Sequence, residues 1–204
     1  SVSITVEGEY RVIRSNSLPD HPIGEFPNPG NPNAPRALER EIRVTLHPQR
    51  AERPTRAAPE FGVALNGVIF DSGTGEFWTA SGQRGRSAWN YDAASPNNQA
   101  RFGVDFNHGH EQPTGKYHYH GVPTGLVEAL ADGHTHDDAH GHGDHAHDMI
   151  QIGWAFDGYP VYAPFGYKDP NDPDSGVVGL ASSYRLKHGS RPGSPDGPGG
   201  VYDG

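Results

Sequence analysis

QPTGKYHYHG occupies residues 112–121 and carries the strongest pattern in the chain. Side chains alternate between the two faces of a strand, so we expect His118 and His120 on one face and Tyr117 and Tyr119 on the other. Two imidazoles on one face form half of a metal site or a proton-transfer pair. Two tyrosines on the opposite face provide an aromatic surface that can pack against a core. The pattern therefore predicts a strand with one chemical face and one structural face.

A second His-x-His pair, His108 and His110, lies just upstream of a predicted turn at residues 113–115. If that turn closes an antiparallel hairpin, His110 faces His118 and His108 faces His120. Directly opposed residues have Cβ atoms about 4.5–5.5 Å apart, and metal–nitrogen bonds are about 2.0–2.1 Å long. Surface histidines, or buried ones bonded to the backbone, would give the same pattern. Two pairs around one turn nevertheless favour a bound metal.

Imidazole ligands suit copper and zinc, and copper(II) has the higher intrinsic affinity. The expected ligands are His110, His118 and His120, with His108 as a fourth ligand or a support and His21 arriving from the N-terminal segment. An imidazole ligand is often oriented through its other ring nitrogen. The aspartates predicted to do this are Asp20, Asp105 and Asp157.

The composition favours a loop-rich, mainly β protein. The 204 residues include 28 glycines and 19 prolines, which leave little room for long helices, while 3 Trp, 9 Tyr and 8 Phe argue for a packed core. A net charge of −9 without a basic stripe excludes nucleic acid and anionic membranes as good partners. No apolar run approaches the ~18–20 residues of a membrane span. Cysteine is absent, so neither disulfides nor thiolate ligands are available.

Apolar periodicity predicts the remaining elements. Strands are expected at residues 2–6, 10–13, 42–46, 61–70 and 149–156, with hairpin turns at Asn66-Gly67 and at residues 156–159. Short helical turns are expected at residues 87–95 and 124–131. Residues 102–106 alternate and would lead as a strand into the first histidine pair, which places Asp105 and Asn107 on the histidine face. The predicted fold is a single domain over residues 1–204, an antiparallel sandwich or barrel-like structure with few short helices.

Residues 133–148 are dominated by histidine and aspartate and have almost nothing to bury, so they are expected to form a mobile insertion. Such a tract captures transition metals weakly and without fixed geometry. The histidines concerned are His134, His136, His140, His142, His145 and His147. Residues 169–176 carry oxygen ligands at calcium-like spacing, but their prolines break the EF-hand pattern and make calcium a weak alternative.

The chain resembles the YHYH domain family of secreted bacterial proteins. The resemblance begins with residues 112–121 and the block PTGL that follows at residues 123–126. It extends over most of the chain, through the blocks at residues 15–21, 89–91, 153–162, 183–187 and 199–204. The resemblance implies export and a mainly β domain, and the start at Ser1 is compatible with a removed signal peptide. Relatives typically continue beyond the Tyr-Asp-Gly block, and the histidine-rich tract looks like an insertion.

Three functions are compatible with these features. The first is an extracellular copper- or zinc-binding protein. The second is a structural or adhesive module of a surface, filament or matrix, in which histidines stabilise the fold or join subunits by self-association. The third is an enzyme, either a metal-dependent hydrolase or a copper redox enzyme, since three histidines with an open position could activate water. No nucleophile motif of the Gly-x-Ser-x-Gly type is present, so catalysis would depend on the metal or on a His/Asp pair.

Overall fold

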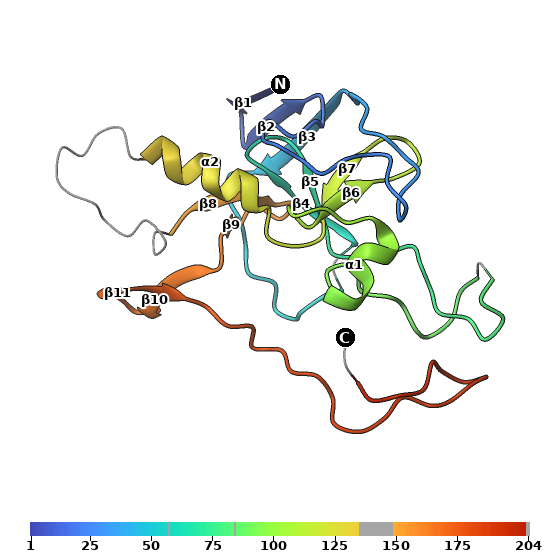
Figure 1. Ribbon diagram of the computed structural model, residues 1–204. Helices are drawn as coiled ribbons and strands as arrows, with labels where there is room; N and C mark the ends of the chain where they lie inside the picture. Colours follow the sequence, from blue (N-terminus) through green and yellow to red (C-terminus); the bar gives the residue numbers. More distant parts are fainter. Residues whose placement is uncertain (57, 84, 135–148, 203–204) are drawn as a thin grey trace.

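The computed structural model describes residues 1–56, 58–83, 85–134 and 149–202 (Figure 1). Over these residues the fold is mainly β, with three sheets, two short helices and no closed barrel. The predicted mainly β class is confirmed. The elements in chain order are β1 Val2–Glu7, β2 Tyr10–Ser15, β3 Arg40–Thr45, β4 Glu60–Ala64, β5 Ile69–Asp71, α1 Pro96–Phe102, β6 Gly109–Glu111, β7 Tyr117–Tyr119, α2 Thr124–His134, β8 Gln151–Ala155, β9 Pro160–Tyr162, β10 Phe165–Asp169 and β11 Asp172–Gly179.

The first sheet is an antiparallel meander in the order β1-β2-β3. Its central strand buries Ile13, which packs with Val44 of β3 and with Val63 and Ile69 of the second sheet. This shared cluster places the three-stranded sheet against the largest sheet. All three strands lie where the apolar alternation predicts them.

The second sheet contains six strands in the order β6-β7-β5-β4-β8-β9. Of the five neighbouring strand pairs in this order, four are antiparallel. The fifth, β5 with β7, is parallel and places Ile69 opposite His118. The predicted Asn66-Gly67 turn joins β4 to β5, with Gly67 in the left-handed region at φ 81°. The predicted turn at residues 156–159 joins β8 to β9.

The tyrosine face of β7 forms the main core. Tyr117 and Tyr119 are 0% and 1% exposed and pack with Phe70 and Ile152 of the same sheet. Helix α2 lies beside β8 and contributes Leu126 to this core (Figure 1). The predicted packing role of the two tyrosines is confirmed.

Two predictions between β5 and β6 are wrong. Helix α1 begins at Pro96, where the predicted helical turn at residues 87–95 should have ended, because proline suits the first position of a helix. The predicted strand at residues 102–106 does not form. Gly103 instead ends α1 in the left-handed conformation, with its N–H bonded to the carbonyls of Ala100 and Gln99. Asp105 and Asn107 are therefore not on the histidine face of a strand.

Strands β10 and β11 form a separate antiparallel hairpin, and residues 180–202 run on from it with little regular structure (Figure 1). The predicted calcium tract at residues 169–176 covers the turn of this hairpin. Side-chain oxygens of Asp169 and Asp172 accept hydrogen bonds from the backbone N–H groups of Asn171 and Asp174. These carboxylates thus stabilise the turn.

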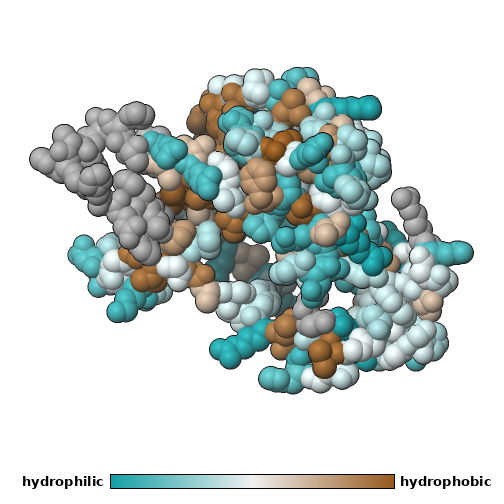
Figure 2. Space-filling model, viewed as in Figure 1, coloured by the Kyte–Doolittle hydropathy of each residue, from teal (hydrophilic) through white to brown (hydrophobic). Residues whose placement is uncertain are grey.

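Apolar side chains on the view of Figure 2 lie in small separate groups among hydrophilic ones. In the part of the chain that the structure describes, neither helix has the length and hydropathy needed to cross a bilayer.

The proline-rich segment at residues 15–36 packs against the second sheet. Asn31 donates from Nδ2 to the Glu111 carbonyl at 2.8 Å, and Gly24 N–H donates to Asp105 Oδ2 at 2.9 Å. Its innermost contact is at the Tyr119 hydroxyl, which lies 2.6 Å from His21 Nε2 and accepts from Asn66 Nδ2 at 2.9 Å. One buried hydroxyl therefore joins this segment, the β4–β5 turn and β7.

We expect Tyr119→Phe to lower the free energy of unfolding by about 1–3 kcal/mol, because it removes the buried partner of His21 Nε2 and one of the two acceptors of Asn66 Nδ2. Urea unfolding of the metal-free protein measures this loss. Tyr184→Phe is the matched control, since Tyr184 is 91% exposed and its change should stay within about 0.5 kcal/mol. Equal effects for the two variants would contradict a structural role for the hydroxyl.

Candidate metal centre

The β6–β7 hairpin brings the histidine pairs together in the predicted register. His110 pairs directly with His118, and the tight turn is closed by the Gly115 N–H donating to the Gln112 carbonyl at 2.8 Å. Gly115 adopts φ 85°, which disfavours any residue with a Cβ atom. His120 follows directly after β7, so its side chain shares the face of His118.

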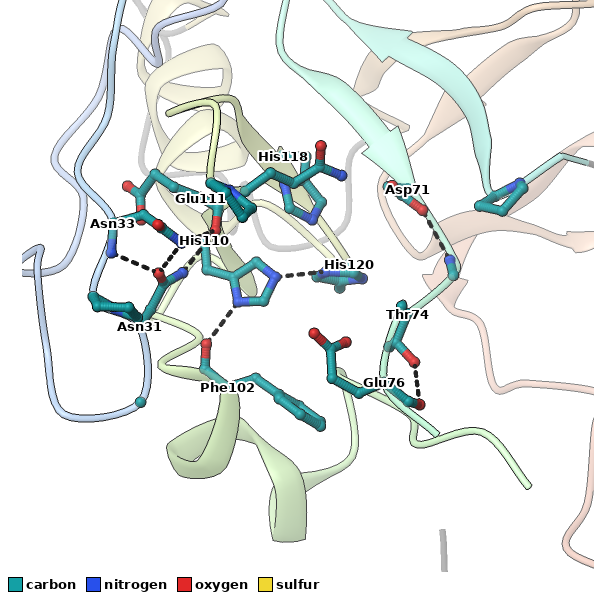
Figure 3. Close-up of a pocket in the computed structure, with 17 residues that line it drawn as sticks. Asn31, Asn33, Asp71, Thr74, Glu76, Phe102, His110, Glu111, His118 and His120 are labelled. Atoms are coloured by element: carbon teal, nitrogen blue, oxygen red, sulfur yellow. Dashed lines mark hydrogen bonds between the residues drawn. The ribbon is translucent and has the colours of Figure 1, made fainter. Parts of the chain in front are cut away.

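Three imidazoles converge at the end of this hairpin (Figure 3). Ring centroids of His110, His118 and His120 are separated by 4.6–4.9 Å, and one ligand atom from each lies within 4.8 Å of the others. Nε2 of His120 is 3.1 Å from Nε2 of His110. The arrangement could hold a single metal ion.

Backbone carbonyls set the tautomers of these rings. Nδ1 of His110 lies 2.7 Å from the Phe102 carbonyl, and Nδ1 of His118 lies 3.3 Å from the Lys116 carbonyl. His120 also has a hydrogen bond with the Asp71 backbone. A carbonyl oxygen only accepts, so each Nδ1 facing one carries the proton. Nε2 of His110 and Nε2 of His118 are then unprotonated, which is the usual arrangement of an oriented imidazole ligand, and Nε2 of His110 is the acceptor in its 3.1 Å contact with His120.

Burial keeps two of the rings neutral. Desolvation, followed by the charges of His120 and His110, lowers the pKa of His118 to about 2. Desolvation and then His110 lower the pKa of His120 to about 4. Only a neutral imidazole binds a metal, so both rings are in the competent state at neutral pH.

The three histidines lie on the wall of a cleft with a volume of about 610 Å³. Strand β5 contributes Asp71, and the loop after it contributes Thr74 and Glu76. The carboxylate of Glu76 points toward the imidazoles in Figure 3. Sequence reasoning missed Glu76, because a single glutamate in a loop between Gly75 and Phe77 carries no motif.

The other two histidines predicted as ligands lie outside this group. His108 adopts φ 55° and lies just before the first paired residue of β6, Gly109. Its Nδ1 lies 2.8 Å from the Val122 carbonyl. The backbone still follows the predicted register, since the His120 N–H donates to the His108 carbonyl. His21 stacks on Tyr119 behind β7, on the face opposite the imidazoles.

The predicted aspartates are engaged elsewhere. Asp105 accepts from the Tyr117 hydroxyl at 2.8 Å and from three backbone N–H groups. Asp20 accepts from Asn66 Nδ2, and Asp157 lies exposed in the β8–β9 turn. Backbone carbonyls orient the rings in place of these carboxylates.

Most of the histidine-rich tract falls outside the described residues. This applies to His136, His140, His142, His145 and His147. Of His134 the structure gives only its place at the end of α2.

One family profile matches the chain. It is described as YHYH protein, and the match covers residues 41–204, which include both histidine pairs. No curated protein and no solved structure matches the chain.

We expect the metal-free protein to lose stability as the pH falls below about 6.5. The unfolded chain protonates His118 and His120 near 6.5, whereas the folded chain does so only at about 2 and about 4. The unfolded state thus binds more protons in this window, and each histidine removes about 1.4 kcal/mol per pH unit from the free energy of unfolding. Urea unfolding between pH 5 and 8 measures this loss.

Glu111 should have the opposite effect on the pH dependence of stability: it should lower the free energy of unfolding as the pH rises. Its carboxylate oxygens are buried without a partner among the described residues, and burial followed by the charge of Asp105 raises its pKa to about 8. The folded state then holds a proton that the unfolded state releases near 4.5, so this contribution is lost as the pH rises toward 8. Stability should therefore peak near pH 6.5, and Glu111→Gln should abolish the decline above the peak. A wild-type protein equally stable at pH 5 and pH 6.5 would contradict the neutral histidines.

Proposed function

Because the chain belongs to the YHYH protein family and brings three imidazoles together, we propose that it is an exported protein that binds one transition-metal ion, copper or zinc, at His110, His118 and His120. The observation that carries the proposal is the convergence of three ligand atoms within 4.8 Å of one another. Their geometry is supported from behind by the packed tyrosines of the same strand. Export rests on the resemblance to secreted proteins.

The donor set supports copper or zinc. Imidazole nitrogen is a borderline ligand that suits both metals, whereas magnesium and calcium prefer oxygen. The metal holds its affinity at neutral pH because protons do not compete for the buried rings of His118 and His120. Three protein ligands leave a further coordination position for another group.

A metal-dependent hydrolase is the second candidate function. The observation in its favour is the cleft of about 610 Å³, which would give a small substrate access to the histidines. An open position on a metal held by three histidines is where water is activated in metallohydrolases. The metal site itself is common to both candidates.

Metal analysis of protein purified without an affinity tag tests the site. Wild type should carry about one equivalent of copper or zinc, and both His110→Gln and the double variant His118→Ala, His120→Ala should lose it. His47→Ala is the matched control, because His47 is exposed and pairs only with Glu9 among the described residues. Circular dichroism confirms that each variant is folded.

Deleting residues 135–147 separates the site from the histidine-rich tract. The deletion leaves both strands of the hairpin and helix α2 in place, so the single tightly bound equivalent should remain. A deletion that removes the bound metal, together with a double variant that keeps it, would reject the three ligands.

A further inference from the structure

Glu76 approaches the histidine cluster from the side opposite the β6–β7 hairpin. It lies in the loop that follows β5, and Figure 3 shows its carboxylate directed toward His110 and His120. The residue is exposed, and among the described residues no hydrogen bond or ion pair uses its carboxylate. One face of the cluster is thus lined by imidazole nitrogen and the facing side by a carboxylate, which lies outside the group of ligand atoms within 4.8 Å of one another and would reach a metal by rotation of its side chain.

The backbone at Glu76 is fixed by several hydrogen bonds. Its carbonyl accepts from Asn90 Nδ2 at 2.7 Å and from the Tyr91 N–H at 3.1 Å. Thr74 Oγ1 donates to the Tyr91 carbonyl at 2.6 Å. The loop begins at a turn in which the Gly73 N–H donates to Asp71 Oδ1 at 3.0 Å. The backbone that carries the Glu76 side chain is therefore held in a defined position.

Two residues that hold this loop in place, Asp71 and Tyr91, are also connected to the rings of His120 and His110. Asp71, where the loop begins, has a backbone hydrogen bond with the ring of His120. Tyr91, to which the loop is bonded, packs edge-on against the Phe102 ring at 5.8 Å, and the Phe102 carbonyl receives the Nδ1 proton of His110. Glu76 and two of the imidazoles are consequently positioned by the same two anchor points.

We propose that Glu76 supplies a fourth, oxygen ligand to the metal and so makes the site selective for a divalent cation, Zn²⁺ or Cu²⁺, over Cu⁺. The inference rests on the proposed function, since it requires a metal at the three histidines. Three imidazoles and one carboxylate complete a tetrahedral site of the kind zinc prefers, and the carboxylate then occupies the position that the hydrolase candidate needs open. A carboxylate also neutralises part of a dication's charge, whereas Cu⁺ prefers soft ligands and gains little from oxygen.

The test is a pair of competition titrations with chromogenic chelators, one for Zn²⁺ and one for Cu⁺ under reducing conditions. Glu76→Gln should raise the Kd for Zn²⁺ by about 10- to 100-fold and change the Kd for Cu⁺ by less than about threefold. Glu39→Gln is the matched control. It removes the same charge from an exposed residue outside the cleft and should leave both constants within about twofold of wild type.

Cobalt(II) provides a second readout that does not depend on affinity. The visible absorption of Co²⁺ reports coordination number and donor type, so loss of an oxygen ligand in Glu76→Gln should shift the spectrum and Glu39→Gln should not. A variant with the wild-type Kd for Zn²⁺ and the wild-type cobalt spectrum would overturn the role of Glu76. Equal weakening of Zn²⁺ and Cu⁺ would overturn the selectivity.

The outcomes also separate this inference from the proposed function. If wild type binds Zn²⁺ and His110→Gln does not, while Glu76→Gln binds as wild type does, only the fourth ligand is rejected. If His110→Gln binds as tightly as wild type, the histidine site itself is rejected, and the fourth ligand with it.

Discussion

The two-residue alternation of side chains along β7 is the constraint on which the rest of the structure depends. It forces Tyr117 and Tyr119 into the core and His118 and His120 onto the opposite face. A strand packed on one side by two fully buried aromatic rings cannot slip by one residue without exchanging the two faces. The position of the imidazoles is therefore determined by hydrophobic packing.

The rings themselves are oriented by backbone carbonyls that come from separate parts of the chain. Phe102 ends helix α1, Lys116 precedes β7, and Asp71 ends β5. The carboxylates predicted for this role have other partners, as Asp105 does by accepting from the Tyr117 hydroxyl and the Gly24 N–H. Because carbonyls carry no net charge, the three-histidine group consists of neutral donors, and the charge of any cation bound there would have to be balanced from the cleft side.

Local patterns in the sequence predicted the hairpin and its register, since the midpoint between His110 and His118 falls in the Pro113–Gly115 turn. They also predicted the strands of the first sheet and the Asn66-Gly67 turn. The role of the Phe102 carbonyl in orienting His110 could not be predicted. The alternation of Phe102, Val104 and Phe106 is typical of a strand, whereas Pro96 and Gly103 start and end a helix there. The approach of Glu76 depends on contacts between residues 74–76 and 90–91, which no periodicity encodes.

The parallel pairing of β5 with β7 has a consequence for how the protein is assembled. Parallel strands cannot be joined by a tight turn, and the connection here contains the Glu76 loop, helix α1 and strand β6. Closing so long a loop carries an entropic cost that a short hairpin does not. A newly synthesised chain can thus form the β6–β7 hairpin early and still lack the side of the cleft that β5 and its following loop supply. A ligand that binds the three histidines would then stabilise the finished protein more than an intermediate in which only the hairpin has formed.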